Sequence, residues 1–97
     1  MNAAVCKLKL FLPENHSLKE KRRIVKSVMG KLRNQYNISI AEVEDQDLWQ
    51  IATIGISIVS SSQNHVDEMI NHMLEYIRQT FPDIEVVSHD VEVMHGF

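Results

Sequence analysis

The sequence predicts an α+β fold, a sandwich in which two helices cover one face of a four-stranded antiparallel sheet. Apolar residues alternate with period two in four segments and recur with helical spacing in two others, and these segments follow one another in the order βαββαβ. Right-handed crossovers close that order as a sheet with the strand order 4-1-3-2. Because 97 residues bury one core but not two, we expect residues 1–97 to form a single ferredoxin-like domain.

The first strand is expected over residues 4–12. One of its faces is apolar throughout, whereas Lys7 and Lys9 interrupt the other. Pro13 ends the run because proline has no backbone N–H to donate to a sheet. The single cysteine, Cys6, lies on the apolar face, so we expect a small core residue rather than a metal ligand or nucleophile.

The motif SLKE predicts the start of the first helix. It forms a capping box, in which the Ser17 hydroxyl accepts from the amide three residues on and Glu20 reaches back to the amide of Ser17. Apolar residues then follow at helical spacing from Leu18 to Tyr36, which predicts a helix of about five turns.

The remaining elements follow from the same two periodicities. Three further strands are expected, at residues 38–44, 50–60 and 84–94, and the loop EDQDLW joins the first two of them. A second amphipathic helix is expected with a polar start at residues 61–64 and an end before Pro82. We expect the last strand to bend at residues 88–90, where polar side chains interrupt its valines.

The positive charge of the chain is concentrated in the first helix. Seven of the ten Lys and Arg residues lie between Lys19 and Arg33, so residues 17–36 carry +6 although the whole chain carries −3. On a helical wheel one sector beside the apolar face holds five of these cations and a glycine: Lys19, Arg22, Arg23, Lys26, Gly30 and Arg33. Cations at this spacing suit a phosphate backbone, and a glycine allows a partner to approach closely.

The alternative is that this charge belongs to a solvated helix surface or is paired within the chain. The acids Asp67, Glu68 and Glu75 would be the partners if the second helix lies alongside the first. Exposed pairs contribute only about 0–1 kcal/mol each, so they would not require so uneven a distribution. Both interpretations stay open at this point.

The sheet face away from the helices is expected to be open and partly apolar. It carries four apolar side chains beside four polar ones: Val5, Phe11, Ile51 and Val59 with Lys7, Lys9, Thr53 and Ser57. A face this apolar usually meets a partner. Because the centre of the third strand has no aromatic residue, we expect any RNA binding to use the first helix rather than base stacking on the sheet.

The acidic loop offers a second candidate protein contact. Its carboxylates lack the DxDxDG spacing of a calcium loop and have no nucleophile nearby, so we expect no metal or catalytic site there. Trp49 ends the loop and either packs within the chain or contacts a protein, since tryptophan is enriched at interface centres. With the open face, the candidate interface residues are Val5, Phe11, Trp49 and Ile51. Glu42 follows Ile38 and Ile40 on the same side of its strand, so either burial ends there or a bulge reorients the chain.

None of the five histidines has the partners of a known type of site. His65 and His72 are seven residues apart, which is about 10 Å along a helix and too far for one metal ion. The other three have no Cys or Ser nucleophile at a recognisable spacing. We therefore expect no metal, no cofactor, no small-molecule substrate and no enzymatic activity.

Three segments resemble a known family: HSLKEKRRIV at 16–25, ISIAEVEDQDLWQIATIGI at 38–56, and VSS at 59–61. On these segments the chain is identified as a member of the YlxP-like family, small bacterial proteins catalogued as a domain of unknown function. The resemblance implies a ferredoxin-like fold, no established activity, and a gene that in many bacteria lies among translation and ribosome maturation factors. It supplies no functional residues.

These observations favour a cytoplasmic, non-catalytic binding module that contacts RNA or a ribosomal particle through the basic sector of the first helix. The alternative is a structural or protein-interaction module that forms a homo-oligomer, in the simplest case a dimer, through the open sheet face and the acidic loop. No apolar run approaches the roughly 18 residues of a membrane helix, and two lysines interrupt the N-terminal stretch, so we expect neither a membrane partner nor a signal peptide.

Overall fold

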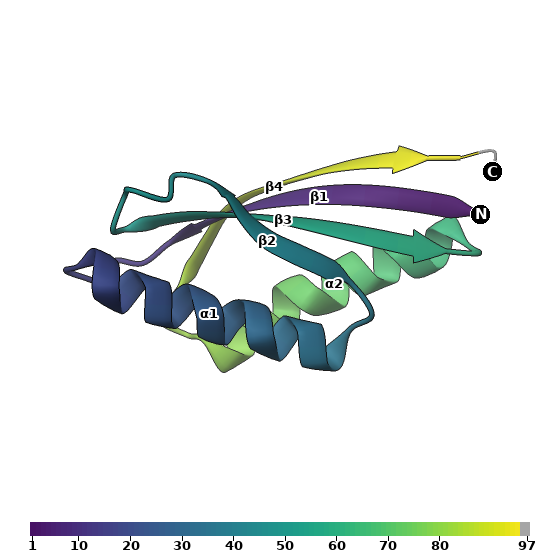
Figure 1. Cartoon of the computed structure of the whole chain (residues 1–97). Helices are drawn as coiled ribbons and strands as arrows, with labels where there is room; N and C mark the ends of the chain where they lie inside the picture. The colour runs from purple at the N-terminus through teal and green to yellow at the C-terminus, as the bar shows by residue number, and fades with distance from the viewer. Residues whose placement is uncertain (96–97) are drawn as a thin grey trace.

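A computed structural model describes residues 1–95 and contains the predicted elements in the predicted order (Figure 1). They are β1 (Asn2–Phe11), α1 (Leu18–Gln35), β2 (Ser39–Glu44), β3 (Ile51–Ser60), α2 (Gln63–Thr80) and β4 (Glu85–Met94). The sheet is antiparallel with the order β2-β3-β1-β4, which is the predicted 4-1-3-2 read from the other edge. Both helices lie on the same side of the sheet. The predicted element order and sheet order are confirmed; residues 96–97 of the expected domain lie outside the described part.

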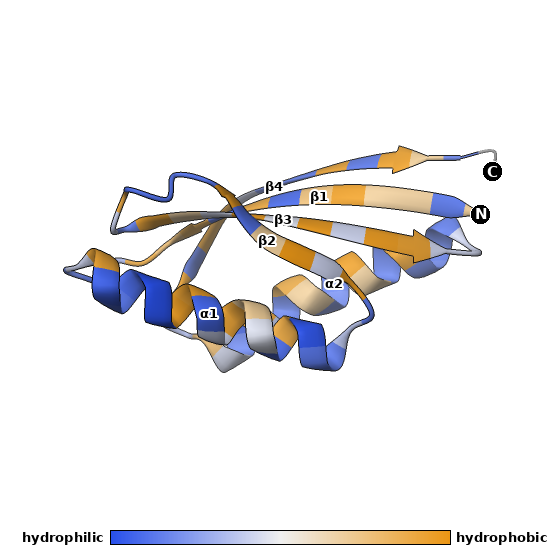
Figure 2. Cartoon of the chain, viewed as in Figure 1, coloured by the Kyte–Doolittle hydropathy of each residue, from blue (hydrophilic) through white to orange (hydrophobic). Residues whose placement is uncertain are grey.

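The core lies between the helices and the helix-facing side of β1 and β3. The alternation in β1 is confirmed, since every second residue from Ala4 to Leu12 is buried, Cys6 included. The sheet residues of this layer meet the apolar stripes of both helices, such as Val28 and Met73 (Figure 2). Full burial of one Leu, Ile or Met side chain stabilises by about 1.5–3 kcal/mol, so this layer supplies the main driving force for folding.

Both helices begin at a serine cap. Ser17 Oγ accepts from the backbone N–H of Glu20 at 3.1 Å, which is the first half of the predicted capping box, and Ser62 Oγ accepts from the N–H of His65 at 3.4 Å. α2 ends two residues before Pro82. A serine cap satisfies an amide that has no partner within its helix, and its loss typically costs about 1 kcal/mol.

Two bulges interrupt the sheet. In β4 the pairing with β1 shifts between Val86 and Ser88, so Val87 is the extra residue and the irregularity begins just before the bend predicted at 88–90. In β2 the pairing with β3 shifts between Glu42 and Glu44, and Val43 is the extra residue. A bulge moves the residues beyond it to the other face of the sheet relative to an uninterrupted strand.

The outer strand β4 is the least covered element. Most of its residues are exposed, among them Val87, Val91 and Met94, although it pairs with β1 along its length. The chain is elongated, with principal extents of 44 × 24 × 21 Å. No helix among residues 1–95 is long and apolar enough to cross a lipid bilayer.

Candidate nucleic-acid and protein interfaces

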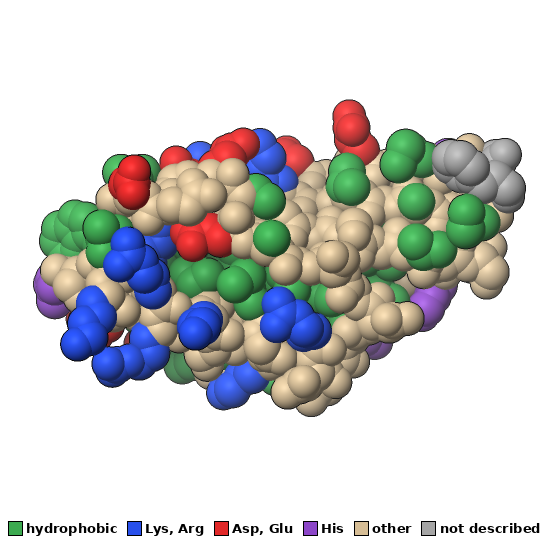
Figure 3. Space-filling view, viewed as in Figure 1, with side chains coloured by type: hydrophobic (Ala, Val, Ile, Leu, Met, Phe, Trp, Pro, Cys, Tyr) green, Lys and Arg blue, Asp and Glu red, His purple; other side chains and the backbone are tan. Residues whose placement is uncertain are grey.

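The basic sector predicted on the first helix forms an exposed strip on α1, which we call the basic ridge: Lys19, Arg22, Arg23, Lys26, Gly30 and Arg33. An α-helix turns by about 100° per residue, so these residues fall within about 100° of arc beside the apolar face, on the solvent side of the helix. All five cations of the ridge are exposed. Figure 3 shows Lys and Arg side chains gathered along α1. The strip runs for about 21 Å along the helix axis.

The cations of the ridge have no carboxylate partner among residues 1–95. The ion pairs found there are Lys7 with Glu44, Lys21 with Glu42, and Arg78 with Glu75. Where the two helices meet, the contacts are instead aromatic: Tyr36 packs edge-on against Tyr76 at 6.3 Å, and Lys31 lies 5.0 Å above the ring of Phe81. Pairing of the ridge with acids of α2, the alternative considered above, is therefore absent from the described structure.

Gly30 lies within the ridge and is not needed there by the packing of this chain. A Cβ atom built at this position would have no neighbour within 4 Å. The backbone is helical, so alanine would fit without strain and would be about 1 kcal/mol more favourable. The space above Gly30 is consequently available to a partner.

One cation of α1 has the opposite environment. Lys21 lies in the centre of the buried stripe with 0% of its side chain exposed, and its Nζ is 3.1 Å from Glu42 Oε2. The same ammonium donates to the backbone carbonyl of Asp45 at 2.6 Å and is 3.5 Å from that of Gln46. Lys21 therefore holds the β2–β3 loop, residues 45–50, against the start of α1.

This contact explains the position of Glu42. The strand does not end its burial there, because Glu42 stays opposite Ile54 on the helix-facing side and meets Lys21. The bulge predicted as one alternative exists, but it follows Glu42 and reorients Glu44 instead. The buried lysine and the partly buried glutamate thus pair through their charges, as buried charges generally must, although Glu42 Oε2 makes no hydrogen bond among residues 1–95.

The loop is fixed at two further points. Asp45 has a left-handed backbone conformation, with φ of 61°, and its Oδ2 accepts from the hydroxyl of Thr53 at 2.5 Å. Asn15, itself buried, donates from Nδ2 to the carbonyl oxygens of Ser17, at 3.0 Å, and Trp49. The segments SLKEKR and AEVEDQDLWQ, far apart in the sequence, are therefore joined side by side.

Thr53 differs from the expectation for the open sheet face. Its register places it on that face, but 0% of the residue is exposed because the side chain of Asp45 folds over it. Phe11 and Ile51, which pair with each other, are partly buried, whereas Val5 and Trp49 are exposed. Of the four candidate interface residues, Val5 and Trp49 are thus well exposed, whereas Phe11 and Ile51 lie at the partly covered end of the open sheet face.

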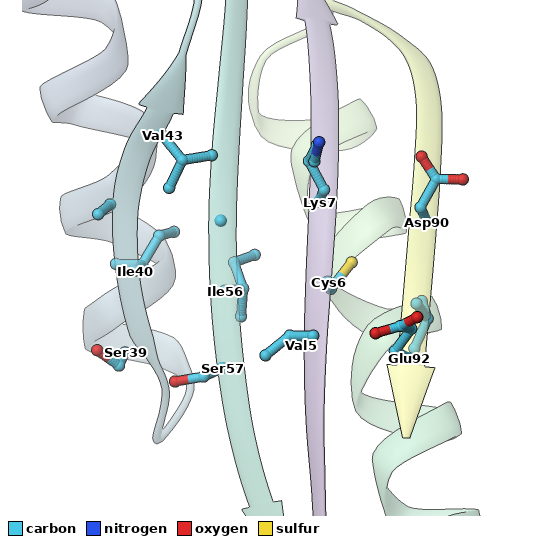
Figure 4. Close-up of a pocket in the computed structure, with 13 residues that line it drawn as sticks. Val5, Cys6, Lys7, Ser39, Ile40, Val43, Ile56, Ser57, Asp90 and Glu92 are labelled. Atoms are coloured by element: carbon cyan, nitrogen blue, oxygen red, sulfur yellow. The ribbon is translucent and has the colours of Figure 1, made fainter. Parts of the chain in front are cut away.

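The exposed part of the open face is hollowed. A cavity of about 640 Å³ lies there, and Figure 4 shows its wall contributed by separate strands, with Val43 from β2, Val5 and Lys7 from β1, and Asp90 from β4. Gly55 lies in the floor of this cavity. A larger residue would collide with Val43 there, because a Cβ atom at position 55 would be 2.8 Å from Val43 Cγ1. Val59, 65% exposed, extends the apolar surface beyond the cavity.

The charged groups of this face are unevenly paired. Lys7 Nζ lies 2.8 Å from Glu44 Oε1, and this hydrogen bond is the main reason that the pKa of Lys7 is raised above its ordinary 10.5. Asp90 and Glu92 of β4 are exposed and have no ion pair within residues 1–95. The cavity therefore combines apolar walls with an acidic edge.

Cys6 has the environment of a core residue. Its thiol is buried and its pKa is raised from 9.0 to about 11, chiefly by burial and further by the charge of Asp90. A thiol with so high a pKa is a poor nucleophile at neutral pH, because the thiolate is the reactive form. Among residues 1–95 no group of three or more His, Cys, Asp or Glu side chains could hold a metal ion.

Three of the five histidines have a hydrogen-bond or ring partner of another residue type. His65 Nδ1 is 2.9 Å from the hydroxyl of Ser60 at the start of α2, and His95 Nδ1 is 2.8 Å from Asn2 Oδ1. His16 packs against Trp49, with ring centroids 6.0 Å apart. His72 and His89 are exposed.

The sequence interpretation missed the contact between Lys21 and Glu42, although a signal for it exists. Lys21 occupies the helical position between Leu18 and Val25 where an apolar residue is expected, and Glu42 occupies a strand position expected to be buried. Two charges of opposite sign that both interrupt apolar faces are candidates to pair. Neither the position of Lys21 nor that of Glu42 predicts the ion pair when it is considered alone.

The comparisons with known proteins agree with the fold. A family model described as "Protein of unknown function (DUF503)" matches residues 3–91. The "Uncharacterized protein YlxP" of Bacillus subtilis (strain 168) is 41% identical over 69 residues, which cover 71% of this chain and 74% of that protein.

Among solved structures, the de novo designed protein Foldit4 aligns over 100% of both chains with a TM-score of 0.55 and 11% identity. The designed protein LFR1 1, which has a ferredoxin fold, aligns over 97% of this chain and 84% of its own with a TM-score of 0.50 and 14% identity. Similarity at this level of identity supports the architecture alone.

Proposed function

The chain belongs to the DUF503 family of proteins of unknown function, in which YlxP is also found, and from this premise we propose that it is a non-catalytic module whose basic ridge binds structured RNA or a ribosomal particle. The observation that carries the proposal is the set of five exposed ridge cations without a carboxylate partner in the described structure. A chain of net charge −3 gathers these cations on one helix, which is the arrangement that steers an anionic partner to one face.

The geometry of α1 favours contact with the phosphate backbone. The ridge is straight and about 21 Å long, and its Lys and Arg side chains are free to reach phosphates along a helical groove. The open sheet face offers no comparable surface: within residues 1–95 its only aromatic, Phe11, is partly buried, and Asp90 and Glu92 add negative charge there. Binding through phosphates makes affinity strongly dependent on salt.

The test is filter binding of a structured RNA across a salt series with charge-matched variants. The variant Arg22→Glu changes the ridge, and Arg78→Glu makes the same charge change on α2, outside the ridge. We expect Arg22→Glu to weaken binding and to reduce the magnitude of the log–log salt slope by about 0.7–0.9 for the lost contact, whereas Arg78→Glu leaves both nearly unchanged. Combined reversal of Lys19, Arg22, Arg23 and Lys26 should abolish binding.

Affinity that ignores salt, or that falls equally with Arg22→Glu and Arg78→Glu, would contradict a role for the ridge. Gly30 gives a second control. Gly30→Ala should raise the free energy of unfolding by about 1 kcal/mol, and Gly30→Gln should keep the fold while placing bulk where a partner approaches. Weaker binding by Gly30→Gln but not by Gly30→Ala would locate the contact at that point of α1.

The open sheet face supports a second candidate function, assembly into a homodimer. The observation that favours it is the 640 Å³ cavity together with the exposed Val5, Val43 and Val59, since contiguous apolar surface of this kind commonly meets a partner. Sedimentation at micromolar concentration tests it, with Val5→Glu as the disrupting variant. A monomer would exclude this assembly, and a dimer would present two basic ridges and strengthen attachment to RNA by avidity.

A further inference from the structure

We propose that the rings of Trp49 and His16 form a stacking site for an unpaired RNA base at one end of the basic ridge. The inference rests on the proposed function of the ridge and specifies the RNA it prefers, which is a duplex with a bulged or flipped base rather than a regular duplex.

Two aromatic rings are presented together at this end of the molecule. Trp49 is 42% exposed and His16 is exposed, and their ring centroids are 6.0 Å apart with an interplanar angle of 47°. Because the rings are tilted rather than stacked on each other, each leaves surface available. Every nucleobase has a π face, so stacking on such rings tolerates any base.

The position of the rings relative to the ridge is fixed by hydrogen bonds. The backbone carbonyl of Trp49 accepts from Asn15, which also binds the carbonyl of Ser17 at the start of α1. Lys21 holds the other end of the loop through the carbonyl of Asp45. His16 immediately precedes the cap Ser17, so Lys19 is about one helical turn away. Figure 3 shows hydrophobic and His side chains gathered beside the Lys and Arg groups at this end.

The charges around the rings explain why a base, rather than a phosphate, would lie there. Glu14 and Asp47 are exposed and each lies two residues before a ring residue, His16 and Trp49, so this end of the molecule carries negative charge that disfavours a phosphate. The nucleic-acid backbone is therefore drawn along α1, and only an uncharged base extended from it contacts the rings. Single-stranded and bulged bases are the parts of RNA that are free to stack on protein aromatics.

The experiment uses the fluorescence of Trp49, the only tryptophan of the chain. Wild-type protein is titrated with a blunt RNA duplex and with the same duplex containing one bulged adenosine. We expect the bulged RNA to quench the fluorescence and to bind about 5- to 150-fold more tightly, which corresponds to the usual contribution of stacking on one aromatic ring. The preference should persist as salt rises, because stacking releases no counterions, while both affinities fall.

Trp49→Ala should remove the preference for the bulged RNA and leave the affinity for the blunt duplex unchanged, since its backbone hydrogen bond remains. Trp49→Phe should retain part of the preference. Equal binding of both RNAs with unchanged fluorescence would overturn the stacking site but not the ridge proposal. A protein contact would then be the remaining role proposed for Trp49. If neither RNA binds, both proposals are overturned.

Discussion

Two ion pairs on opposite faces of β2 have similar N···O distances and different surroundings. On the helix-facing side Glu42 meets Lys21 at 3.1 Å, with side chains 19% and 0% exposed. On the open side Glu44 meets Lys7 at 2.8 Å, with side chains 50% and 49% exposed. The shorter pair is the weaker constraint on the fold, because water screens it and solvates either partner alone.

The bulge at Val43 creates this difference. In an uninterrupted strand Glu42 and Glu44 would share one face, since side chains alternate with period two. The extra residue turns Glu44 to the open face, where Lys7 reaches it, and leaves Glu42 toward α1. Burial, rather than the N···O distance, therefore determines which ion pair contributes more to the stability of the fold.

The largest effect is expected from Lys21→Met. It leaves Glu42 and the carbonyl of Asp45 without their buried cation, so we expect the free energy of unfolding to fall by about 3–5 kcal/mol. Lys26→Met, on the exposed ridge of the same helix, should change it by less than about 0.5 kcal/mol. Urea unfolding followed by circular dichroism measures both.

The variant Lys21→Met with Glu42→Leu should recover only part of the loss, because the backbone carbonyls of Asp45 and Gln46 still lack their donor. If Lys21→Met unfolds the chain, Glu42→Gln provides the milder test. Equal destabilisation by Lys21→Met and Lys26→Met would show that burial does not separate the two lysines.

An intermediate effect on stability is expected from a substitution at Gly55, which tests the bulge at Val43. Gly55→Ala places a Cβ atom 2.8 Å from Val43 Cγ1 and should displace the bulged residue. In a double-mutant cycle with Val43→Ala, we expect a coupling of about 1–2 kcal/mol, with Gly55→Ala better tolerated when Val43 is alanine. Additive effects would mean that the bulge does not depend on the space above Gly55.

The smallest effect is expected from the exposed pair and depends on pH. The pKa of Lys7 is raised above 10.5, chiefly by its hydrogen bond to Glu44, so the folded state favours the charged form. Its contribution to stability is therefore present below pH 10.5 and is lost as the pH rises through the raised pKa.

We expect the difference in unfolding free energy between wild type and Lys7→Met to shrink over this range, and also in high salt. The titration of Cys6 is common to both proteins and cancels in the comparison. If the difference in unfolding free energy between wild type and Lys7→Met stays constant with pH and salt, the ion pair of Lys7 with Glu44 is not its cause.

Most of the fold could be predicted from local patterns. The period-two alternation of β1, the cap at Ser17 and the stop before Pro82 each depend on a few neighbouring residues, and the structure places them where expected. The charged strip on α1 was also predictable, because helical spacing fixes which side chains share a face. The bend in β4 was placed at 88–90, although the extra residue is Val87, since a bulge depends on the register with β1.

The environment of individual charges could not be predicted in the same way. Lys21 is one of the seven cations between Lys19 and Arg33, yet it is buried, because Glu42 and the loop carbonyls reach it from more than twenty residues away. Thr53 was expected on an open face and is covered by Asp45 for the same reason.

The sequence by itself determined the order of the elements, the apolar faces and the helix that carries the positive charge, because each depends on spacing within one segment. Only the tertiary structure decided which lysine is buried, which of two glutamates it meets, and that Trp49 lies beside the start of α1. These depend on the free energy of removing a charge or a ring from water, and that quantity is set by whatever distant segment packs against it.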